Sequence, residues 1–321
     1  MNEAILNSHA NKRRSRGDDA SVNSEYAGIV VELRQLRAAS QLSRYRGVAP
    51  RLPSREGISK IVGSLVSALY PHHFGPPGLD ARDADAFVAR TLEKTLPAIE
   101  RQLELALALE QKDTRDPENT NHRSAAEITQ MFAAALPKIR AALDKDVRAA
   151  FGNDPSAKSI DEVIFCFPGV AAIVRHRMAH ELYRLGASLL ARIVAEIAHA
   201  LAGVDIHPGA EIGEGFFIDH GTGVVIGETA VIGRNVRIYQ AVTLGAKRFE
   251  VGGDGKLRKS YPRHPIVEDD VVIYAGATIL GRITIGRGSS IGGNVWLTES
   301  VPPGSRITQA RTQANAGGIS I

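Results

Sequence analysis

An aspartate, a histidine and an arginine–histidine pair could do chemistry together in this sequence. Asp205 precedes His220 by fifteen residues, and Arg263 and His264 follow further along the chain. A carboxylate that accepts one ring N–H of a histidine fixes its tautomer and leaves the other nitrogen as a general base. No serine or cysteine nucleophile accompanies this pair, so the base would activate a hydroxyl or amine brought by a substrate. Arginine and histidine donors suit a carboxylate on that substrate.

A six-residue repeat begins at Asp205 and must position these side chains. It predicts a three-sided, left-handed parallel β-helix, in which each hexapeptide is one short strand and a corner, and stacked coils bury a continuous apolar column. A β-sandwich would show period two instead. Three series of aliphatic residues are expected to point inward: Ile206, Ile212 and Ile218; Ile226, Ile232, Ile238 and Leu244; and Ile273, Ile279, Ile285, Ile291 and Leu297.

Two interruptions of the repeat carry the polar residues. The first is a two-residue slip after Ile218 that contains the run DHGTG, and the second is a long excursion between Leu244 and Ile273. Residues that leave a regular coil are released from packing and can meet a ligand. We therefore expect the functional site at these interruptions.

The whole chain is expected to have an α+β fold, with helices ahead of the β-helix. Apolar residues three and four apart predict an all-α domain, including a capping box at Ser124 and Glu127 and an unbroken helical segment over 170–201. The first fifty residues are polar and are expected to be largely disordered. The predicted boundaries are 1–50 for this extension, 51–204 for the α-helical domain, 205–306 for the β-helix domain with its excursion at 246–266, and 307–321 for a flexible tail.

Composition limits the classes of protein. The 321 residues are 44% hydrophobic and carry a formal charge of +4, which suits a small anionic substrate as well as nucleic acid, and we assign no nucleic-acid partner. The longest apolar stretch contains Arg184, Arg192 and Glu196, which argues against a membrane span. The N-terminus lacks the apolar core of a secretory signal, and the single cysteine, Cys166, is expected to be buried. A cytoplasmic protein is therefore predicted.

His176 and His180 lie four residues apart on one predicted helix face and could hold a metal ion. Zinc proteases with this spacing carry Glu directly after the first His, where this chain has Arg177. No third ligand is evident, so a structural role is predicted for both histidines and no metal is assigned.

Three runs, DIHP at 205–208, IDHGTG at 218–223 and RHP at 263–265, occur together in one known family. With the sequence around them they closely resemble serine O-acetyltransferases, the first committed enzymes of cysteine synthesis. The resemblance covers about residues 135–305 and includes GNDPS at 152–156 in the helical half. It implies transfer of an acetyl group from acetyl-CoA, as co-substrate, to the hydroxyl of L-serine, with no resident cofactor.

The resemblance also implies a role for each polar residue. His220, oriented by Asp205, would take the proton from the serine hydroxyl, and the alkoxide would attack the thioester without an acyl-enzyme. Cysteine, which shares the amino-acid backbone, is expected to compete for the same site. Four residues would bind serine: Arg263 and His264 its carboxylate, and Asp154 and Asp219 its ammonium group.

The family's assembly implies partners as well. Acetyl-CoA would lie along Gly245, Ala246 and Ala275 between neighbouring copies of the β-helix, so a homotrimer or a dimer of trimers is expected. The C-terminal Ile321 is hypothesised to insert into the active site of O-acetylserine sulfhydrylase.

Other functions stay open on the residues alone. A trimeric metal hydratase of the carbonic-anhydrase kind also uses this β-helix, but it needs three zinc-binding histidines. Here the β-helix holds only His207, His220 and His264, with no close pair in sequence. The same fold also serves acetyltransferases with other acceptors and could serve as a non-catalytic scaffold.

Overall fold

The computed structural model describes residues 24–45, 50–113, 123–253 and 255–309. The chain divides into two compact units, Met1–Pro50 and Arg51–Ile321, and each is described by itself. In the first unit a short 3-10 helix, η1 (Ser24–Tyr26), leads into helix α1 (Ala27–Tyr45).

Helix α1 differs from the predicted disorder of the N-terminal extension. Ile29, Leu33 and Leu36 recur at three- and four-residue spacing within a polar segment, which is enough to define an apolar helix face. All three side chains are exposed. The polar composition of the segment concealed this periodicity in the sequence.

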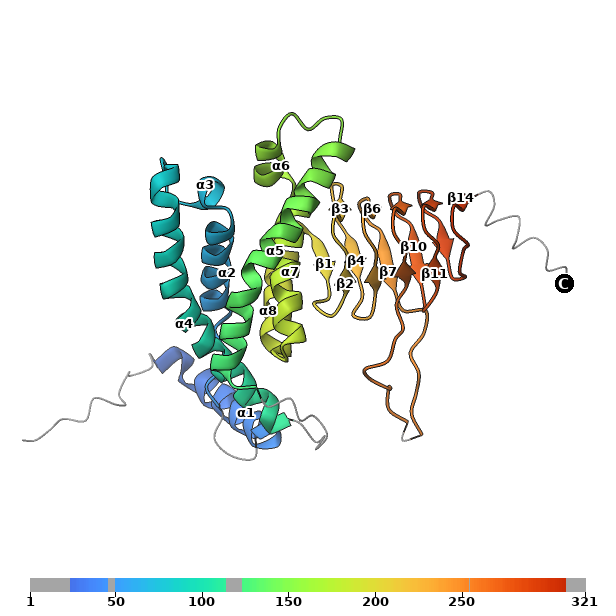
Figure 1. Cartoon of the computed structure of the whole chain (residues 1–321). Coiled ribbons are helices and arrows are strands. Elements are labelled where there is room, and N and C mark those ends of the chain that lie inside the picture. The colour runs from blue at the N-terminus through green and yellow to red at the C-terminus, as the bar shows by residue number, and fades with distance from the viewer. Residues whose placement is uncertain (1–23, 46–49, 114–122, 254, 310–321) are drawn as a thin grey trace, which may run out of the picture. The chain divides into compact units, whose positions relative to one another are not determined.

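In the described residues, seven helices form the helical half of the second unit (Figure 1). The capping box predicted at Ser124 and Glu127 is confirmed. The unbroken segment predicted over 170–201 is wrong, because Gly186, with φ of 94°, separates two helices. The bounds are α2 (Arg55–Leu69), α3 (Pro71–Phe74), α4 (Ala81–Asp113), α5 (Ala125–Asn153), α6 (Ile160–Cys166), α7 (Pro168–Arg184) and α8 (Ser188–Ala202).

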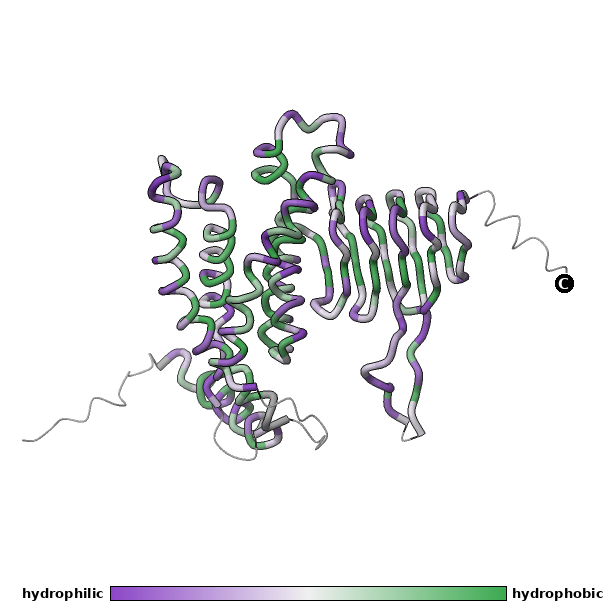
Figure 2. The backbone as a smooth tube through the Cα atoms, in the orientation of Figure 1, coloured by the Kyte–Doolittle hydropathy of each residue, from purple (hydrophilic) through white to green (hydrophobic). Residues whose placement is uncertain are grey.

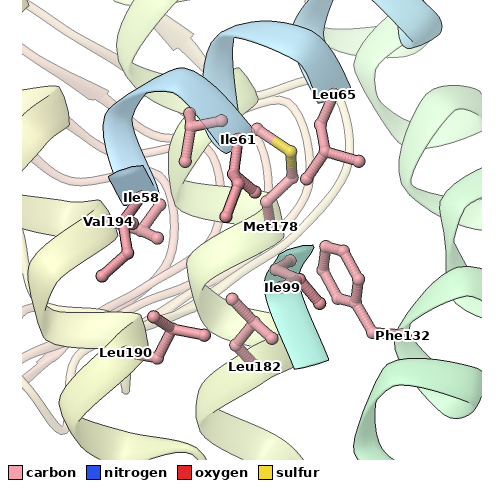
Figure 3. Close-up of a pocket in the computed structure, with 10 residues that line it drawn as sticks. Ile58, Ile61, Leu65, Ile99, Phe132, Met178, Leu182, Leu190 and Val194 are labelled. Carbon is pink, nitrogen blue, oxygen red and sulfur yellow. The ribbon is translucent and has the colours of Figure 1, made fainter. Parts of the chain in front are cut away.

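These helices pack around a closely filled apolar core (Figure 3). Ile58 of α2, Phe132 of α5 and Met178 of α7 are among the hydrophobic residues that surround a void of ≈ 10 Å³. A void of this size holds about one water molecule, and without polar partners it stays dry. The helical core is therefore packing and not a ligand site.

Short parallel strands form the predicted three-sided β-helix. Face A has the order β1-β4-β7-β10-β13, face B the order β2-β5-β8-β11, and face C the order β3-β6-β9-β12-β14. The strands are β1 (Val204–Ile206), β2 (Glu211–Ile212), β3 (Phe217–Ile218), β4 (Val224–Ile226), β5 (Val231–Ile232), β6 (Arg237–Ile238), β7 (Thr243–Gly245), β8 (Ile266–Val267), β9 (Val272–Ile273), β10 (Thr278–Leu280), β11 (Thr284–Ile285), β12 (Ser290–Ile291), β13 (Trp296–Leu297) and β14 (Arg306–Ile307).

The predicted inward series is confirmed. Its members are buried except Ile212, which is half-buried, and Figure 2 colours most of the strands as hydrophobic. After the excursion the series resumes at Val267, one repeat earlier than predicted, because Val267 pairs with Ile232. Ile206 pairs with Ile226, and Ile226 pairs with Leu244, so the first coil is two residues longer than the second.

The excursion between β7 and β8 leaves the β-helix as a hairpin (Figure 1). Val251 bridges Leu257 in antiparallel fashion, and the Gly252 N–H donates to the carbonyl of Lys256 at 2.8 Å. The chain returns to the β-helix immediately before Ile266, so Arg263 and His264 lie at the base of the hairpin.

A buried ion pair joins the helical half to the first coil. The Arg177 guanidinium on α7 donates two hydrogen bonds to the Asp146 carboxylate on α5, at 2.6 and 2.8 Å. Arg177 also donates to the carbonyl of Gly213, and Asp146 accepts the N–H of Phe216. Burial raises the pKa of Asp146, although Arg177 opposes the shift. Because the pair is satisfied from both sides, it fixes the end of α5 against the β-helix.

Two further expectations concern exposure. Cys166 is exposed rather than buried, because it is the last residue of α6, whose inward side chains are Val163 and Ile164. In the described residues, no helix combines the length and the hydropathy needed to cross a membrane.

Candidate functional site

Most of the predicted site residues lie on two of the three edges of the β-helix. We call the edge between faces C and A the His220 edge and the edge between faces A and B the Arg263 edge. The His220 edge comprises residues 219–223, 239–242, 274–277 and 292–295, and the Arg263 edge comprises residues 207–210, 227–230, 246–265 and 281–283.

The run DHGTG forms a left-handed loop on the His220 edge. His220 has φ of 56°, and Gly221 and Gly223 have φ of 89° and 76°. A side chain at Gly221 would also bring its Cβ within 2.9 Å of Val204. Left-handed backbone costs a non-glycine residue roughly 1 kcal/mol or more, and such strain is concentrated at functional sites. The loop leaves the His220 side chain 71% exposed.

His220 contacts the carboxylate beside it in sequence. Oδ1 of Asp219 lies 3.8 Å from Nε2 of His220. Among the described residues, no hydrogen bond or ion pair joins His220 to Asp205, which lies exposed on β1 alongside Val225. The first coil is longer than the regular repeat, so fifteen residues do not return the chain to the same point. The His220–Asp205 dyad therefore stays a prediction.

Asp154 reaches the same edge from the helical half. It is the C-cap of α5, and its carboxylate accepts hydrogen bonds from the Ser156 hydroxyl at 2.7 Å and N–H at 2.8 Å. These bonds hold the pKa of Asp154 below its usual value, and the charge of His220 lowers it further. Arg237 on β6 donates to the carbonyl of Asn153 at 3.0 Å, which ties the end of α5 to face C. The structure therefore brings Asp154 near His220.

Arg263 is held in a polar network on the other edge. Its guanidinium donates to Oε2 of Glu228 at 2.6 Å, and the Tyr183 hydroxyl donates to Oε1 at 3.0 Å. Burial alone would raise the pKa of Glu228, but the hydrogen bonds from Arg263 and Tyr183 outweigh burial and leave this pKa below its usual value. The Arg263 and Glu228 side chains are 19% and 23% exposed, so solvent still reaches the pair.

His264 has a fixed tautomer. The backbone N–H of Thr229 donates to its Nδ1 at 3.0 Å, so Nδ1 is unprotonated and Nε2 carries the hydrogen. Burial and then the charge of Arg263 lower the pKa of His264 to about 4. Gly227 permits this arrangement, because a Cβ there would lie 2.0 Å from the ring. His264 is therefore a neutral N–H donor at physiological pH.

The two groups do not meet within one chain. His220, Asp219 and Asp154 gather at the His220 edge, whereas Arg263 and His264 lie at the other edge, across the width of face A. A strand of three residues spans roughly 10 Å. The predicted acetyl-CoA residues divide in the same way: Ala246 lies at the Arg263 edge directly after Gly245, the last residue of β7, and Ala275 lies at the His220 edge.

His207 and His180 have structural contacts. Nδ1 of His207 accepts the N–H of Gly209 at 2.9 Å and caps a corner, while His180 hydrogen-bonds the carbonyl of Pro208 at 2.8 Å. Burial depresses the pKa of His176 well below its usual value and lowers that of His207 to about 4. No group of three or more metal-ligating side chains occurs within the described ranges.

Sequence reasoning missed Glu228, Thr229 and Tyr183. Glu228 and Thr229 follow Gly227 in the run IGET. The six-residue repeat is unbroken there, so the local pattern does not distinguish these two residues. Their partners are 34 or 35 residues away along the chain, and Tyr183 comes from α7. Ile321, the predicted contact with a sulfhydrylase, lies outside the described residues.

Comparison with known proteins gives consistent similarities. A family model described as bacterial transferase hexapeptide (six repeats) matches residues 264–299. The plasmid serine acetyltransferase of Synechococcus elongatus is 56% identical over 275 residues, which cover 84% of this chain and 86% of the relative. The serine acetyltransferase of Mycobacterium tuberculosis is 53% identical over 166 residues, which cover 52% of this chain and 69% of the relative.

Solved structures resemble the fold as well. Entamoeba histolytica serine acetyltransferase 1 in complex with L-cysteine matches with a TM-score of 0.67 and 31% identity, covering 88% of this chain and 97% of that one. Neisseria gonorrhoeae serine acetyltransferase in complex with serine matches with a TM-score of 0.50 and 29% identity, covering 77% of this chain and 93% of that one.

Proposed function

The chain belongs to the serine acetyltransferase family, and we propose that it transfers the acetyl group of acetyl-CoA to L-serine by direct attack, with His220 as the general base. The supporting observation is the placement of His220 on a left-handed, exposed loop beside two carboxylates, Asp154 and Asp219. An imidazole in this position is open to a substrate hydroxyl and is not committed to packing.

The proposed reaction needs no covalent enzyme intermediate. His220 removes the proton from the serine hydroxyl while the oxygen attacks the thioester carbonyl, and the protonated imidazole then donates to the departing CoA thiolate. Asp205 would orient His220 after a rotation of the exposed imidazole, and Asp219 already lies beside it. The products are O-acetylserine and CoA, and no resident cofactor or metal is required.

Serine would be bound from both ends. Asp154 and Asp219 supply carboxylates for its ammonium group. Arg263 and the Nε2–H of His264 supply donors for its carboxylate, because Nδ1 of His264 is occupied by Thr229. Cysteine carries the same ammonium and carboxylate groups, so it would compete with serine. The complexes of two relatives with cysteine and with serine support such a site.

The separation of these groups supports a site formed by two copies of the chain. The His220 edge of one copy would face the Arg263 edge of the next, which brings the base and the carboxylate donors together. Repeating that contact around an axis closes a ring, and a three-sided β-helix suits a trimer. A dimer of trimers would follow if the helical halves also associate. Acetyl-CoA would enter the same cleft, along Gly245 and Ala246 of one copy and Ala275 of the next.

A thiol-release assay tests the reaction. Purified protein is given acetyl-CoA with L-serine, L-homoserine, a hexose or no acceptor, and free CoA is measured. Release that depends on L-serine is expected, and release that depends on the hexose instead would identify a different acetyltransferase. Unchanged CoA release after metal removal would argue against the metal-hydratase alternative.

Mixing two inactive variants tests the shared site. His220→Ala and Arg263→Ala chains, carrying different tags, are co-expressed and the mixed oligomers are isolated. If each site combines edges of neighbouring copies, every mixed trimer contains one site in three that is built from two intact edges, so the isolated mixed trimers should recover about a third of the activity. If the site lies within one chain, the mixture should be as inactive as its parents.

A separate experiment tests O-acetylserine sulfhydrylase as a partner. The tagged chain, either complete or lacking Ile321, is used to co-purify untagged sulfhydrylase, and the complete chain alone is expected to retain it.

A further inference from the structure

Two adjacent residues, Glu228 and Thr229, contact two other adjacent residues, Arg263 and His264, one coil further along face B. We propose that Glu228 and Thr229 are positioning residues that hold Arg263 and His264 as a matched pair of donors for the substrate carboxylate. The inference rests on the proposed function. It deepens that function by assigning the selectivity for a substrate carboxylate to the two residues that hold the donors in place, Glu228 and Thr229.

Glu228 fixes the guanidinium. Its Oε2 accepts from Arg263 at 2.6 Å, while its Oε1 accepts the Tyr183 hydroxyl at 3.0 Å. Arg263 also donates a longer bond to the carbonyl of Tyr261, at 3.3 Å, and its guanidinium lies 5.6 Å from the centroid of the Tyr261 ring. Tyr183 belongs to α7, which Arg177 ties to the first coil. Glu228 is therefore held by a rigid element and in turn selects one orientation of Arg263.

Thr229 fixes the imidazole and the backbone that carries both donors. Its hydroxyl accepts the N–H of Arg263 at 2.9 Å and the N–H of His264 at 3.2 Å. The same hydroxyl lies 2.9 Å from Nδ1 of His264, to which the Thr229 N–H also donates. Arg282 completes the clamp by donating to the carbonyls of Thr229 and His264, at 2.6 and 3.1 Å.

These contacts have a chemical consequence. Glu228 neutralises much of the charge of Arg263, so simple electrostatic attraction for anions is reduced. Recognition then depends on the arrangement of the donors. The further N–H groups of the Arg263 guanidinium and the Nε2–H of His264 are held beside each other on adjacent residues. Two oriented donors match the two oxygens of a carboxylate better than they match an amide or an alcohol. Pre-organisation of this kind lowers KM without altering the reacting atoms.

The substrate itself provides the test. Glu228→Ala, Glu228→Gln, Thr229→Val and Thr229→Ser are compared on L-serine and on L-serinamide, which retains the hydroxyl and the ammonium group but lacks the carboxylate. Glu228→Ala and Thr229→Val are expected to lower kcat/KM for L-serine about 10-fold or more through KM, and to change kcat/KM for L-serinamide less than about threefold. Thr229→Ser should restore most of the loss, and Glu228→Gln should be intermediate.

Asp269→Ala is the matched control. Asp269 also links two coils through an arginine, accepting the N–H and the guanidinium of Arg234 at 2.8 and 3.1 Å, but on the corner between faces B and C. It should leave both substrates unaffected. Equal losses on L-serine and L-serinamide in the Glu228 and Thr229 variants would mean that these residues only support the fold, and the proposal would be wrong.

A readout without turnover covers variants of low activity. The affinity for L-serine, measured by calorimetry on the folded protein, should fall about 10-fold or more in Thr229→Val and change less than about threefold in Thr229→Ser. An unchanged affinity in Thr229→Val would overturn the role of Thr229. If the unaltered protein releases no CoA with L-serine, the proposed function is wrong. If it does release CoA, but the Glu228 and Thr229 variants keep the same selectivity for L-serine over L-serinamide, only the positioning role is wrong.

Discussion

The two edges of the β-helix hold their proposed functional side chains in opposite ways. At the His220 edge the proposed base sits on a strained left-handed loop, largely exposed, with one carboxylate 3.8 Å away. At the Arg263 edge the proposed carboxylate donors are half-buried or buried, and each is held by several hydrogen bonds. A regular coil can thus carry an exposed reactive group on one corner and a hydrogen-bonded recognition group on another.

The difference follows from how each edge departs from the repeat. The slip at DHGTG adds two residues to the first coil, and although Gly221 packs against Val204 and Ile218, the His220 side chain is left exposed. The excursion, in contrast, returns to the β-helix at Arg263 and His264, where Thr229 and Glu228 of the coil before it receive them. We therefore expect the Arg263 edge to determine how tightly serine binds. The His220 edge is expected to determine the rate of the reaction through proton transfer.

The largest effect should come from removing the base. His220→Ala is expected to lower kcat about 10³-fold, within the usual range for a general base, with little change in stability because the side chain is exposed. Stopped-flow or steady-state CoA release measures the rate, and urea unfolding measures stability. His199→Ala, at an exposed position on α8, is the control. Full turnover without the His220 imidazole would remove the contrast between the edges.

A smaller effect is expected from the carboxylates around the base. If the predicted dyad forms during turnover, Asp205→Asn should lower kcat about 10- to 100-fold. Asp219→Asn should act chiefly on the KM for serine, because Asp219 is proposed to bind the ammonium group. Steady-state kinetics with both substrates varied separates these outcomes. A pure KM effect in Asp205→Asn would assign orientation of His220 to Asp219 instead.

The rigid edge can be disturbed through its glycine. A Cβ at Gly227 would lie 2.0 Å from the His264 ring, so Gly227→Ala must displace the imidazole. We expect about a 10-fold rise in the KM for serine with a much smaller change in kcat. Gly253→Ala, in the hairpin where a Cβ meets nothing within 4 Å, is the control. A fall in kcat with unchanged KM would show that the two edges are not functionally separate.

The smallest effect concerns acid stability. The pKa of His264 and that of His207 are both lowered to about 4 by burial first and then by arginine charge, so the unfolded chain binds more protons between about pH 6.5 and pH 4. Stability should therefore fall as the pH drops through this window, by about 1 to 2 kcal/mol for each histidine after allowance for solvent. Urea unfolding at several pH values measures it. His207→Gln should flatten the slope below pH 6.5 and leave it unchanged above pH 7.

The sequence predicted the β-helix well because its signal is local and repeated. Each inward aliphatic residue is six positions from the next, and that spacing alone defines the faces. The helical half was predicted as a class, but the break at Gly186 was missed because the apolar spacing continues through it. Helix α1 was missed because its apolar face is narrow and surrounded by polar residues.

The site was predicted in part for the same reason. Residues at the interruptions, such as His220 and Arg263, could be found because they depart from a pattern. Glu228 and Thr229 could not, since they occupy ordinary positions of the repeat and gain their meaning only from residues 34 or 35 positions away. Predicting that the two groups lie on opposite sides of face A would also have needed the register of the coils. The two extra residues of the first coil change that register.

The order of the coils has a consequence for how such a chain can vary in length. The proposed site residues of the β-helix lie between β1 and β10, and the strands beyond them contact only their immediate neighbours. Whole turns could be gained or lost at the far end with the distance between the two edges preserved. A turn inserted between β4 and β7, by contrast, would lift one half of the site past the other by a full strand spacing of about 4.8 Å.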